Sequence, residues 1–140
     1  MNYYKCKYFQ IYELIDPITF HKWGEQAWMF FNPHILFSLD QIREYYGKPI
    51  TVNTWFHGGE FSMRGLRPPT SNIGATYGQH RFGNAFDYDV KGLSAEQVRQ
   101  DIIEHKDDLF KYVTCLEANV NWVHMDCRNI ENRIMLVYPK

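Results

Sequence analysis

A histidine and an aspartate in the second half of the chain have side chains that bind transition metals. His80 and Asp87 are seven positions apart, with Gly83 and Ala85 between them. Glycine turns the chain without a steric penalty from a Cβ atom, and the small alanine leaves room for an ion close to the backbone. A histidine nitrogen and an aspartate oxygen both bind Zn²⁺ at about 2.0–2.2 Å. His80 and Asp87 are therefore candidate metal ligands.

His124 is a third candidate ligand. It lies in a segment where strand alternation places Trp122, His124 and Asp126 on one face. If residues 118–121 form a four-residue hairpin loop, Glu117 pairs opposite Trp122 and shares that face, one diagonal step from His124. Three protein ligands leave a fourth position for water, as in catalytic zinc sites. Zinc lowers the pKa of that water to about 7, and a carboxylate such as Glu117 can accept its proton.

The other histidines lie outside this arrangement. His57 stands in a loop of residues 57–78 that is rich in glycine and has no periodicity. Such loops are usually functional or disordered, so His57 either lies over a cleft and binds substrate or has no role at a metal. The remaining histidines lie on predicted helices and are expected to be surface or packing residues: His21, His34 and His105.

The order of the candidate ligands resembles the D-Ala-D-Ala metallopeptidases, a family of zinc D,D-carboxypeptidases, dipeptidases and L-Ala-D-Glu phage endolysins whose fold the Hedgehog signalling domain shares. The family pattern is Ser-x-His-x-x-Gly-x-Ala-x-Asp, then a Glu shortly before Trp-x-His. This chain has Gly-Gln-His-Arg-Phe-Gly-Asn-Ala-Phe-Asp at 78–87 and Trp-Val-His at 122–124. The resemblance implies zinc as the cofactor, Glu117 as the general base, and three zinc ligands: His80, Asp87 and His124.

An upstream arginine extends the resemblance, which covers roughly residues 51–126. Gly65-Leu66-Arg67 is similar to the family's Gly-Tyr-Arg segment. Its arginine would stabilise the substrate carbonyl and the developing oxyanion, a charge-stabilising role. Arg64 is a rival for this role. Trp122 is either a packing residue of the sheet or a wall of the substrate cleft.

Two positions differ from the family pattern. Gly78 replaces the serine that stands two residues before the first histidine, which removes a hydroxyl group from the surroundings of the metal. Glu117 precedes His124 by seven residues, and Asn121, which cannot act as a base, occupies the closer spacing of some members. Asp126 is an alternative base, or a residue that orients a ligand or makes a surface contact.

Capping signals and periodicity predict three helices. Asp16-Pro17 and Asn32-Pro33 start two of them, and Gly47 ends the second. Ser94 caps the third, with Gln97 at the capping-box position. The predicted helices therefore cover residues 17–31, 33–46 and a segment after residue 94.

Segments rich in β-formers predict the strands of an antiparallel sheet, at 8–15, 50–56, 84–90, 112–117, 122–126 and 133–138. Helices followed by hairpin-connected strands indicate an α+β fold. The resemblance implies a Hedgehog-like or D,D-peptidase-like arrangement, with the helices mainly on one side of the sheet.

Composition limits the class of protein. A chain of 140 residues with 45% hydrophobic residues is expected to form one domain, here a single zinc peptidase domain over residues 1–140. The net charge of −1, without a basic stripe, argues against nucleic-acid and membrane-surface partners. An odd number of cysteines without a CxxC motif argues against a disulfide framework and indicates a reducing compartment. These are Cys6, Cys115 and Cys127.

Together these observations predict a zinc metallopeptidase that hydrolyses peptide bonds of peptidoglycan stem or cross-link peptides, as a D,D-carboxypeptidase or an endolysin-type endopeptidase. No signal peptide is recognisable. We therefore expect the protein to be made in the cytoplasm. The resemblance further implies a phage or prophage protein that acts on the cell wall after release or as part of a phage particle, and we expect a monomer. The alternatives are a Hedgehog-like zinc-binding module without catalysis and a zinc hydrolase for a substrate other than a peptide.

Overall fold

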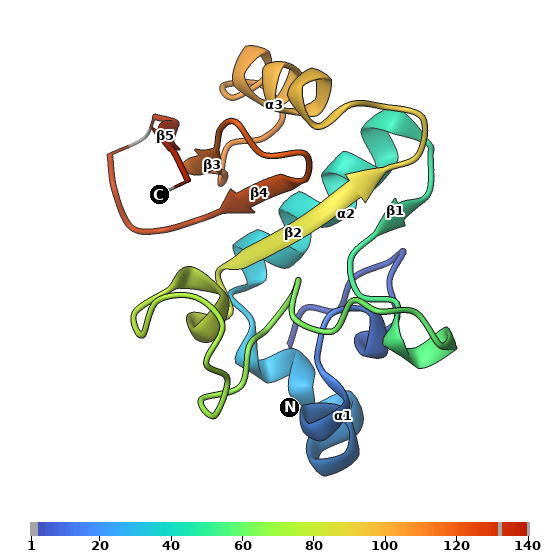
Figure 1. Cartoon of the computed structure of the whole chain (residues 1–140). Coiled ribbons are helices and arrows are strands. Elements are labelled where there is room, and N and C mark those ends of the chain that lie inside the picture. Colours follow the sequence, from blue (N-terminus) through green and yellow to red (C-terminus); the bar gives the residue numbers. More distant parts are fainter. Residues whose placement is uncertain (1–2, 132, 140) are drawn as a thin grey trace.

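The computed structural model describes residues 3–131 and 133–139. In this part of the chain, three α-helices and a five-stranded sheet form a small α+β domain (Figure 1). The α-helices are α1 (Pro17–Trp23), α2 (Pro33–Tyr46) and α3 (Ala95–Glu104). The strands are β1 (Ile50–Thr51), β2 (Ala85–Val90), β3 (Cys115–Glu117), β4 (Val123–Asp126) and β5 (Met135–Val137). Four 3-10 helices connect them: η1 (Ile11–Glu13), η2 (Gly24–Phe30), η3 (Trp55–His57) and η4 (Gln79–Phe82).

The predicted caps of α2 and α3 are confirmed. The Asn32 side chain accepts a hydrogen bond from the backbone of His34 at the start of α2, and Gly47 ends this helix with φ = 60°. Ser94 and Gln97 form a reciprocal capping box at the start of α3. Each helix therefore begins where its side chains satisfy the free backbone N–H groups.

The N-terminal segment differs from its prediction in two ways. The strand expected at 8–15 is wrong: this segment contains η1, because Glu13 accepts a hydrogen bond from the Gln10 backbone (2.7 Å) and closes a turn. The helix expected at 17–31 is α-helical only to Trp23. Gly24 adopts φ = 52°, and the chain continues to Phe30 as η2.

The sheet has the order β1-β2-β4-β3-β5. Three of its strand pairs are antiparallel, but β5 runs parallel to β3, so the expected all-antiparallel sheet is corrected to a mixed one. β5 lies beside β3, on the side away from β4 (Figure 1). Several strands are shorter than predicted. The segment expected at 50–56 pairs only through β1, because it turns into η3.

Alternation along β2 and β4 separates an apolar face from a polar face. Phe86, Tyr88 and Met125 are fully buried in a core to which α2 and α3 contribute apolar side chains. Asp87 and His124 alternate with these residues and therefore point to the opposite face. Figure 1 shows α2 passing behind β2, and α1 and α3 at opposite ends of the molecule. Among the described residues, no helix is long and apolar enough to cross a bilayer.

Gly83 is a position where the fold requires glycine. It has φ = 71° between η4 and β2, and a Cβ atom there would overlap the carbonyl oxygen of Phe30. Both the left-handed backbone and this overlap disfavour a side chain at position 83. We therefore expect Gly83→Ala to lower the free energy of unfolding by about 3 kcal/mol. Gly92 has φ = 81° but no heavy atom within 4 Å, so Gly92→Ala should cost only about 1 kcal/mol. Urea denaturation of both variants measures the difference, and equal losses would contradict the packing argument.

Candidate metal centre

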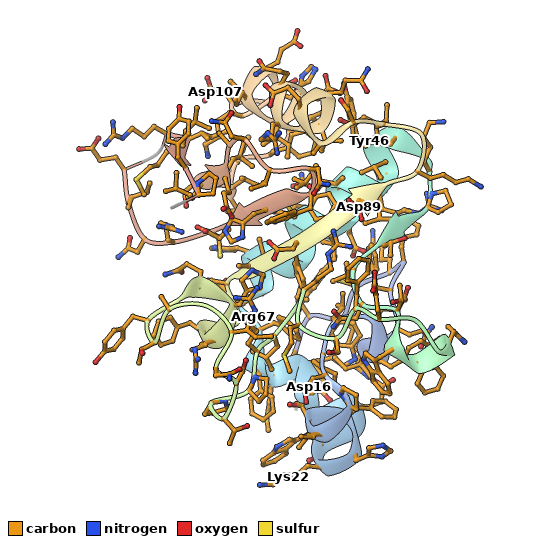
Figure 2. The ribbon with its side chains drawn as sticks, viewed as in Figure 1. Asp16, Lys22, Tyr46, Arg67, Asp89 and Asp107 are labelled. Carbon is orange, nitrogen blue, oxygen red and sulfur yellow. The ribbon has the colours of Figure 1, made fainter. Side chains whose placement is uncertain are left out.

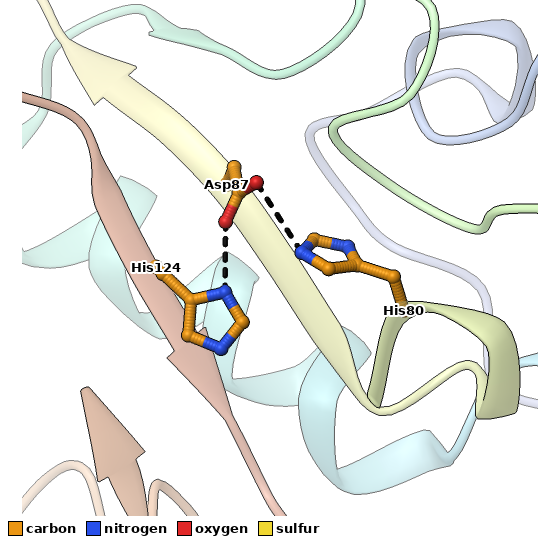
Figure 3. Close-up of side chains that lie close together, drawn as sticks. All are labelled: His80, Asp87 and His124. Carbon is orange, nitrogen blue, oxygen red and sulfur yellow. Dashed lines mark hydrogen bonds and ion pairs between the residues drawn. The ribbon is translucent and has the colours of Figure 1, made fainter. Parts of the chain in front are cut away.

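Three elements bring His80, Asp87 and His124 together (Figure 3). Asp87 on β2 and His124 on β4 are direct partners in the antiparallel register. His80 lies on η4, and the turn at Gly83 returns the chain to β2 so that the imidazole of His80 faces Asp87. Figure 3 shows all three side chains on the same side of the two strands, with a helix of the core behind. All three residues are buried.

The side-chain distances fit a common centre. His124 Nδ1 lies 2.8 Å from Asp87 Oδ1, and His80 Nε2 lies 3.3 Å from Asp87 Oδ2. One ligand atom from each residue lies within 4.8 Å of the others. The group could therefore hold a metal ion, as the sequence predicts for these three residues.

The second ring nitrogen of each histidine has its own partner. His80 Nδ1 lies 2.9 Å from the carbonyl oxygen of Gly65, which can only accept a hydrogen bond. His124 Nε2 lies 2.7 Å from Asp126 Oδ2. These contacts place N–H groups away from the cluster and direct His80 Nε2 and His124 Nδ1 toward the centre. Partners of this kind orient histidine ligands in metal sites, so the donor set of two nitrogens and one oxygen fits a divalent ion such as zinc.

The contacts within the cluster shift the pKa values of His124 and Asp87. Burial alone would lower the pKa of His124, but hydrogen bonds with Asp126 and Asp87 outweigh burial and raise it to about 9. Burial alone would likewise raise the pKa of Asp87, but hydrogen bonds from His124 and His80 hold it well below its usual range. Asp87 therefore remains an anion at neutral pH. A divalent cation held by these residues would displace the proton from His124 Nδ1, because a histidine binds metal through a deprotonated nitrogen.

Asp126 contacts the outer ring nitrogen of His124. It is fully buried and accepts hydrogen bonds from Arg128 Nε (2.8 Å) and Nη2 (2.6 Å) as well as contacting His124. Its carboxylate is thus occupied, which favours its predicted alternative role of orienting a ligand over that of a base. The sequence analysis missed Arg128, although its spacing of two from Asp126 at the end of a strand could have indicated a shared face.

Loss of the Asp126 carboxylate is expected to weaken metal binding without removing a ligand. We expect Asp126→Asn to raise the Kd for zinc by about 10–100-fold, the usual effect of removing an outer-shell partner of a histidine ligand. Asp108→Asn is the matched control, because Asp108 also contacts a histidine, His105, but at an exposed surface (3.2 Å). Competition with a chromophoric chelator measures both Kd values. An unchanged Kd for Asp126→Asn would exclude the positioning role.

Glu117 lies closer to His124 in the sheet than predicted. The expected pairing of Glu117 with Trp122 is wrong, because Cys115 pairs with Asp126 and Leu116 with Met125. Continuation of this register places Glu117 directly opposite His124, still on the face that carries the metal cluster. Glu117 is half-buried. Burial lowers the pKa of Arg67, the arginine beside Asp87, and the negative charge of Glu117 is one of those that oppose this shift. The sequence-based register was wrong by two residues because the loop between the strands is longer than four residues.

The two candidate arginines contact different carboxylates. Arg67 Nη2 lies 3.4 Å from Asp87 Oδ2, and its Nε donates to the carbonyl of Met63 (2.8 Å). Arg64 Nη1 contacts Asp89 (2.9 Å), while the Arg64 carbonyl accepts the backbone N–H of Asp87 (2.7 Å). Arg67 is thus the arginine whose guanidinium reaches a candidate ligand.

A hollow of about 440 Å³ opens beside the cluster and contains Asp87 in its lining. Trp122 and Arg64, both predicted to bind substrate, line this hollow. Buried Arg99 on α3 donates to the carbonyls of Val120 and Trp122 and so fixes the loop that carries the tryptophan. The sequence analysis did not identify the other lining residues, which are Phe61, Asp89 and Asn121.

His57 is not brought to the cluster. It lies on η3, where its ring meets Tyr12 edge-on at a centroid distance of 5.7 Å. The hollow that it lines contains none of the candidate ligands. The three cysteines are free thiols, in agreement with their odd number, and none belongs to the metal-binding group among the described residues.

Comparisons with family models, curated proteins and solved structures gave no match. The chemistry of the site therefore rests on its own geometry.

Proposed function

We propose that this protein is a zinc-dependent peptidase that hydrolyses peptide bonds of peptidoglycan stem or cross-link peptides. The observation that carries the proposal is the His80, Asp87 and His124 cluster beside a hollow, with a carboxylate, Glu117, opposite one of the ligands. Three protein ligands with an open position are typical of catalytic zinc, whereas structural zinc sites have four protein ligands. The arrangement thus favours hydrolysis over a purely structural metal.

The residues around the hollow have separate roles in catalysis and substrate binding. When bound, zinc supplies Lewis-acid polarisation of a carbonyl and lowers the pKa of a coordinated water to about 7. Glu117 accepts a proton from the attacking water and returns it to the leaving amine, as a general base that becomes a general acid. Arg67 stabilises the negative charge that develops on the carbonyl oxygen. Trp122 and Arg64 contact the substrate from the wall of the hollow.

The substrate class and setting rest on the resemblance of residues 78–87 and 122–124 to the D-Ala-D-Ala metallopeptidases. On this basis we assign the Hedgehog-like or D,D-peptidase-like fold, and a carboxypeptidase or endolysin activity. We also propose a monomeric phage or prophage protein that acts on the cell wall after release or within a phage particle. The mixed sheet, with the cluster on the face opposite the core, is compatible with this assignment.

Hydrolysis of defined muropeptides tests the proposed function. We expect the zinc-loaded protein to release new amino groups from purified muropeptides, to lose this activity with a chelator and to regain it with zinc. Mass spectrometry of the products identifies the bond. A zinc-loaded protein that leaves every muropeptide intact would contradict the peptidase and favour the zinc-binding module without catalysis. Equal hydrolysis of simple esters and amides would indicate a hydrolase of other substrates.

A further inference from the structure

A second hollow, of about 430 Å³, contains Arg67 in its lining. Its lining comes from α1, η2, the segment 66–69 and η4. Arg67 belongs both to this lining and, through its contact with Asp87, to the surroundings of the cluster. Arg81, which also lines the hollow, directly follows the candidate ligand His80. A group bound here would therefore lie next to the metal centre.

The lining is positively charged. It contains Lys22, Arg67 and Arg81 and no acidic residue among the described lining residues. Arg81 donates to the loop carbonyls of Pro69, Ser71 and Ala75, so three of its five N–H groups hold the loop while its charge adds to the positive lining. The field in the hollow thus favours an anion.

Two further cationic groups are available to a ligand. Arg67 uses Nε and Nη2 in its contacts with Met63 and Asp87, and its Nη1 has no hydrogen bond to the described residues. A Cβ atom at position 74 would stand 2.5 Å from this Nη1, so Gly74 leaves space beside it. Lys22 is exposed, with its Nζ 5.7 Å from the centroid of the Trp23 ring. Figure 2 shows Arg67 near the middle of the molecule and Lys22 further out on α1.

Aromatic rings form the apolar part of the lining. Trp23 and Phe30 meet edge-on with centroids 5.1 Å apart, and Phe82 is 51% exposed. Apolar walls with a few charged groups are typical of small-ligand sites. Cationic side chains beside aromatic rings favour an organic anion, whose methylene or methyl groups contact the rings, over a fully hydrated inorganic anion.

We propose that this hollow binds a carboxylate of the peptide substrate, either the C-terminal carboxylate or that of an acidic side chain. Arg67 and Lys22 attract the carboxylate, and Trp23, Phe30 and Phe82 contact its carbon chain. The assignment of the carboxylate to a substrate rests on the proposed function. Binding of a carboxylate in this hollow does not rest on the proposed function, because none of the residues that would bind it is a candidate metal ligand.

Three matched probes distinguish the source of the carboxylate. N-acetylglutamine carries only the α-carboxylate, N-acetylglutamate α-amide only the side-chain carboxylate, and N-acetylglutamine amide neither. None contains a bond between two residues. NMR titration of the whole protein should show at least one carboxylate probe binding about threefold or more tightly than the neutral amide. The indole signal of Trp23, assigned with Trp23→Phe, should shift. Added salt should weaken the carboxylate probe selectively, since it screens exposed charges.

Two variants separate charge from apolar contact. Lys22→Glu should remove the preference for the carboxylate probe, whereas Phe82→Ala should weaken all three probes alike. Lys48→Glu is the control, because Lys48 is exposed and lines none of the described hollows. Equal binding of the three probes, no binding of any, or a preference that Lys22→Glu leaves intact would overturn the carboxylate site. Because these readouts need neither zinc nor turnover, their failure is distinguishable from failure of the proposed peptidase.

Discussion

Replacement of Asp87 by asparagine is expected to reduce zinc from about one per chain to near zero, since one three-ligand site holds one ion. Asp87 provides an anionic carboxylate between the two imidazoles, with Oδ1 2.8 Å from His124 Nδ1 and Oδ2 3.3 Å from His80 Nε2. Apparent zinc-binding free energies are about 10–16 kcal/mol. One ligand in three therefore accounts for roughly 4 kcal/mol, or about 1,000-fold in Kd. Elemental analysis after dialysis, with chelator competition, measures this change.

Asp89 offers a matched control on the same strand. Asp89 lies two residues further along β2, on the same face, but its side chain is 49% exposed and pairs with Arg64. The Asp87 side chain is only 11% exposed. Asp89→Asn should therefore retain zinc. Circular dichroism of both variants shows whether each is folded, and zinc retained by a folded Asp87→Asn would show that the cluster is not the binding site.

Glu117→Gln is expected to separate catalysis from metal binding. The variant should keep its zinc, because Glu117 is not in the ligand group. Its kcat should fall by about 10²–10⁴-fold, the usual contribution of a general base. Muropeptide hydrolysis under single-turnover conditions measures the loss, and Glu104→Gln, an exposed change at the end of α3, is the control.

Two results for Glu117→Gln would contradict its assignment. Full activity would mean that another group accepts the proton. Loss of zinc together with activity would mean that Glu117 is itself a ligand, and the site would then have four protein ligands. Four ligands would favour a structural metal and the zinc-binding module without catalysis.

Local signals in the sequence predicted two of the helices and the two strands that carry Asp87 and His124, but not the 3-10 helix that carries His80. Asn32 and Ser94 start helices because their side chains accept backbone N–H groups, an effect that needs no tertiary contact. Alternation along β2 and β4 separated the buried apolar residues from Asp87 and His124. Glycine and alanine between His80 and Asp87 indicated a close approach of the chain, and Gly83 is indeed a turn with positive φ. The three candidate ligands followed from these patterns.

Features set by contacts between distant segments were not predictable in the same way. Residues 8–15 have β propensity but no neighbouring strand, and the turn closed by Glu13 decides their structure. The β3–β4 register depends on the conformation of the loop, in which Asn119 has φ = 61° and Arg99 holds two carbonyls. The parallel pairing of β5 depends on a crossover that periodicity does not encode. The cationic hollow joins Lys22 to Arg67, 45 positions apart in the sequence.

X-ray absorption at the zinc edge tests directly whether His80, Asp87 and His124 bind the metal, because it reports the atoms bound to the ion. We predict about one zinc per chain, with two histidine nitrogens at about 2.0–2.1 Å from the ion and oxygens of Asp87 and water at about 2.0–2.2 Å. The histidine signal should disappear when His80 and His124 are both replaced. A zinc–sulfur distance of about 2.3 Å would place the ion at a cysteine instead. That distance, or a protein that takes up no zinc at all, would contradict the assignment of His80, Asp87 and His124 as the metal site.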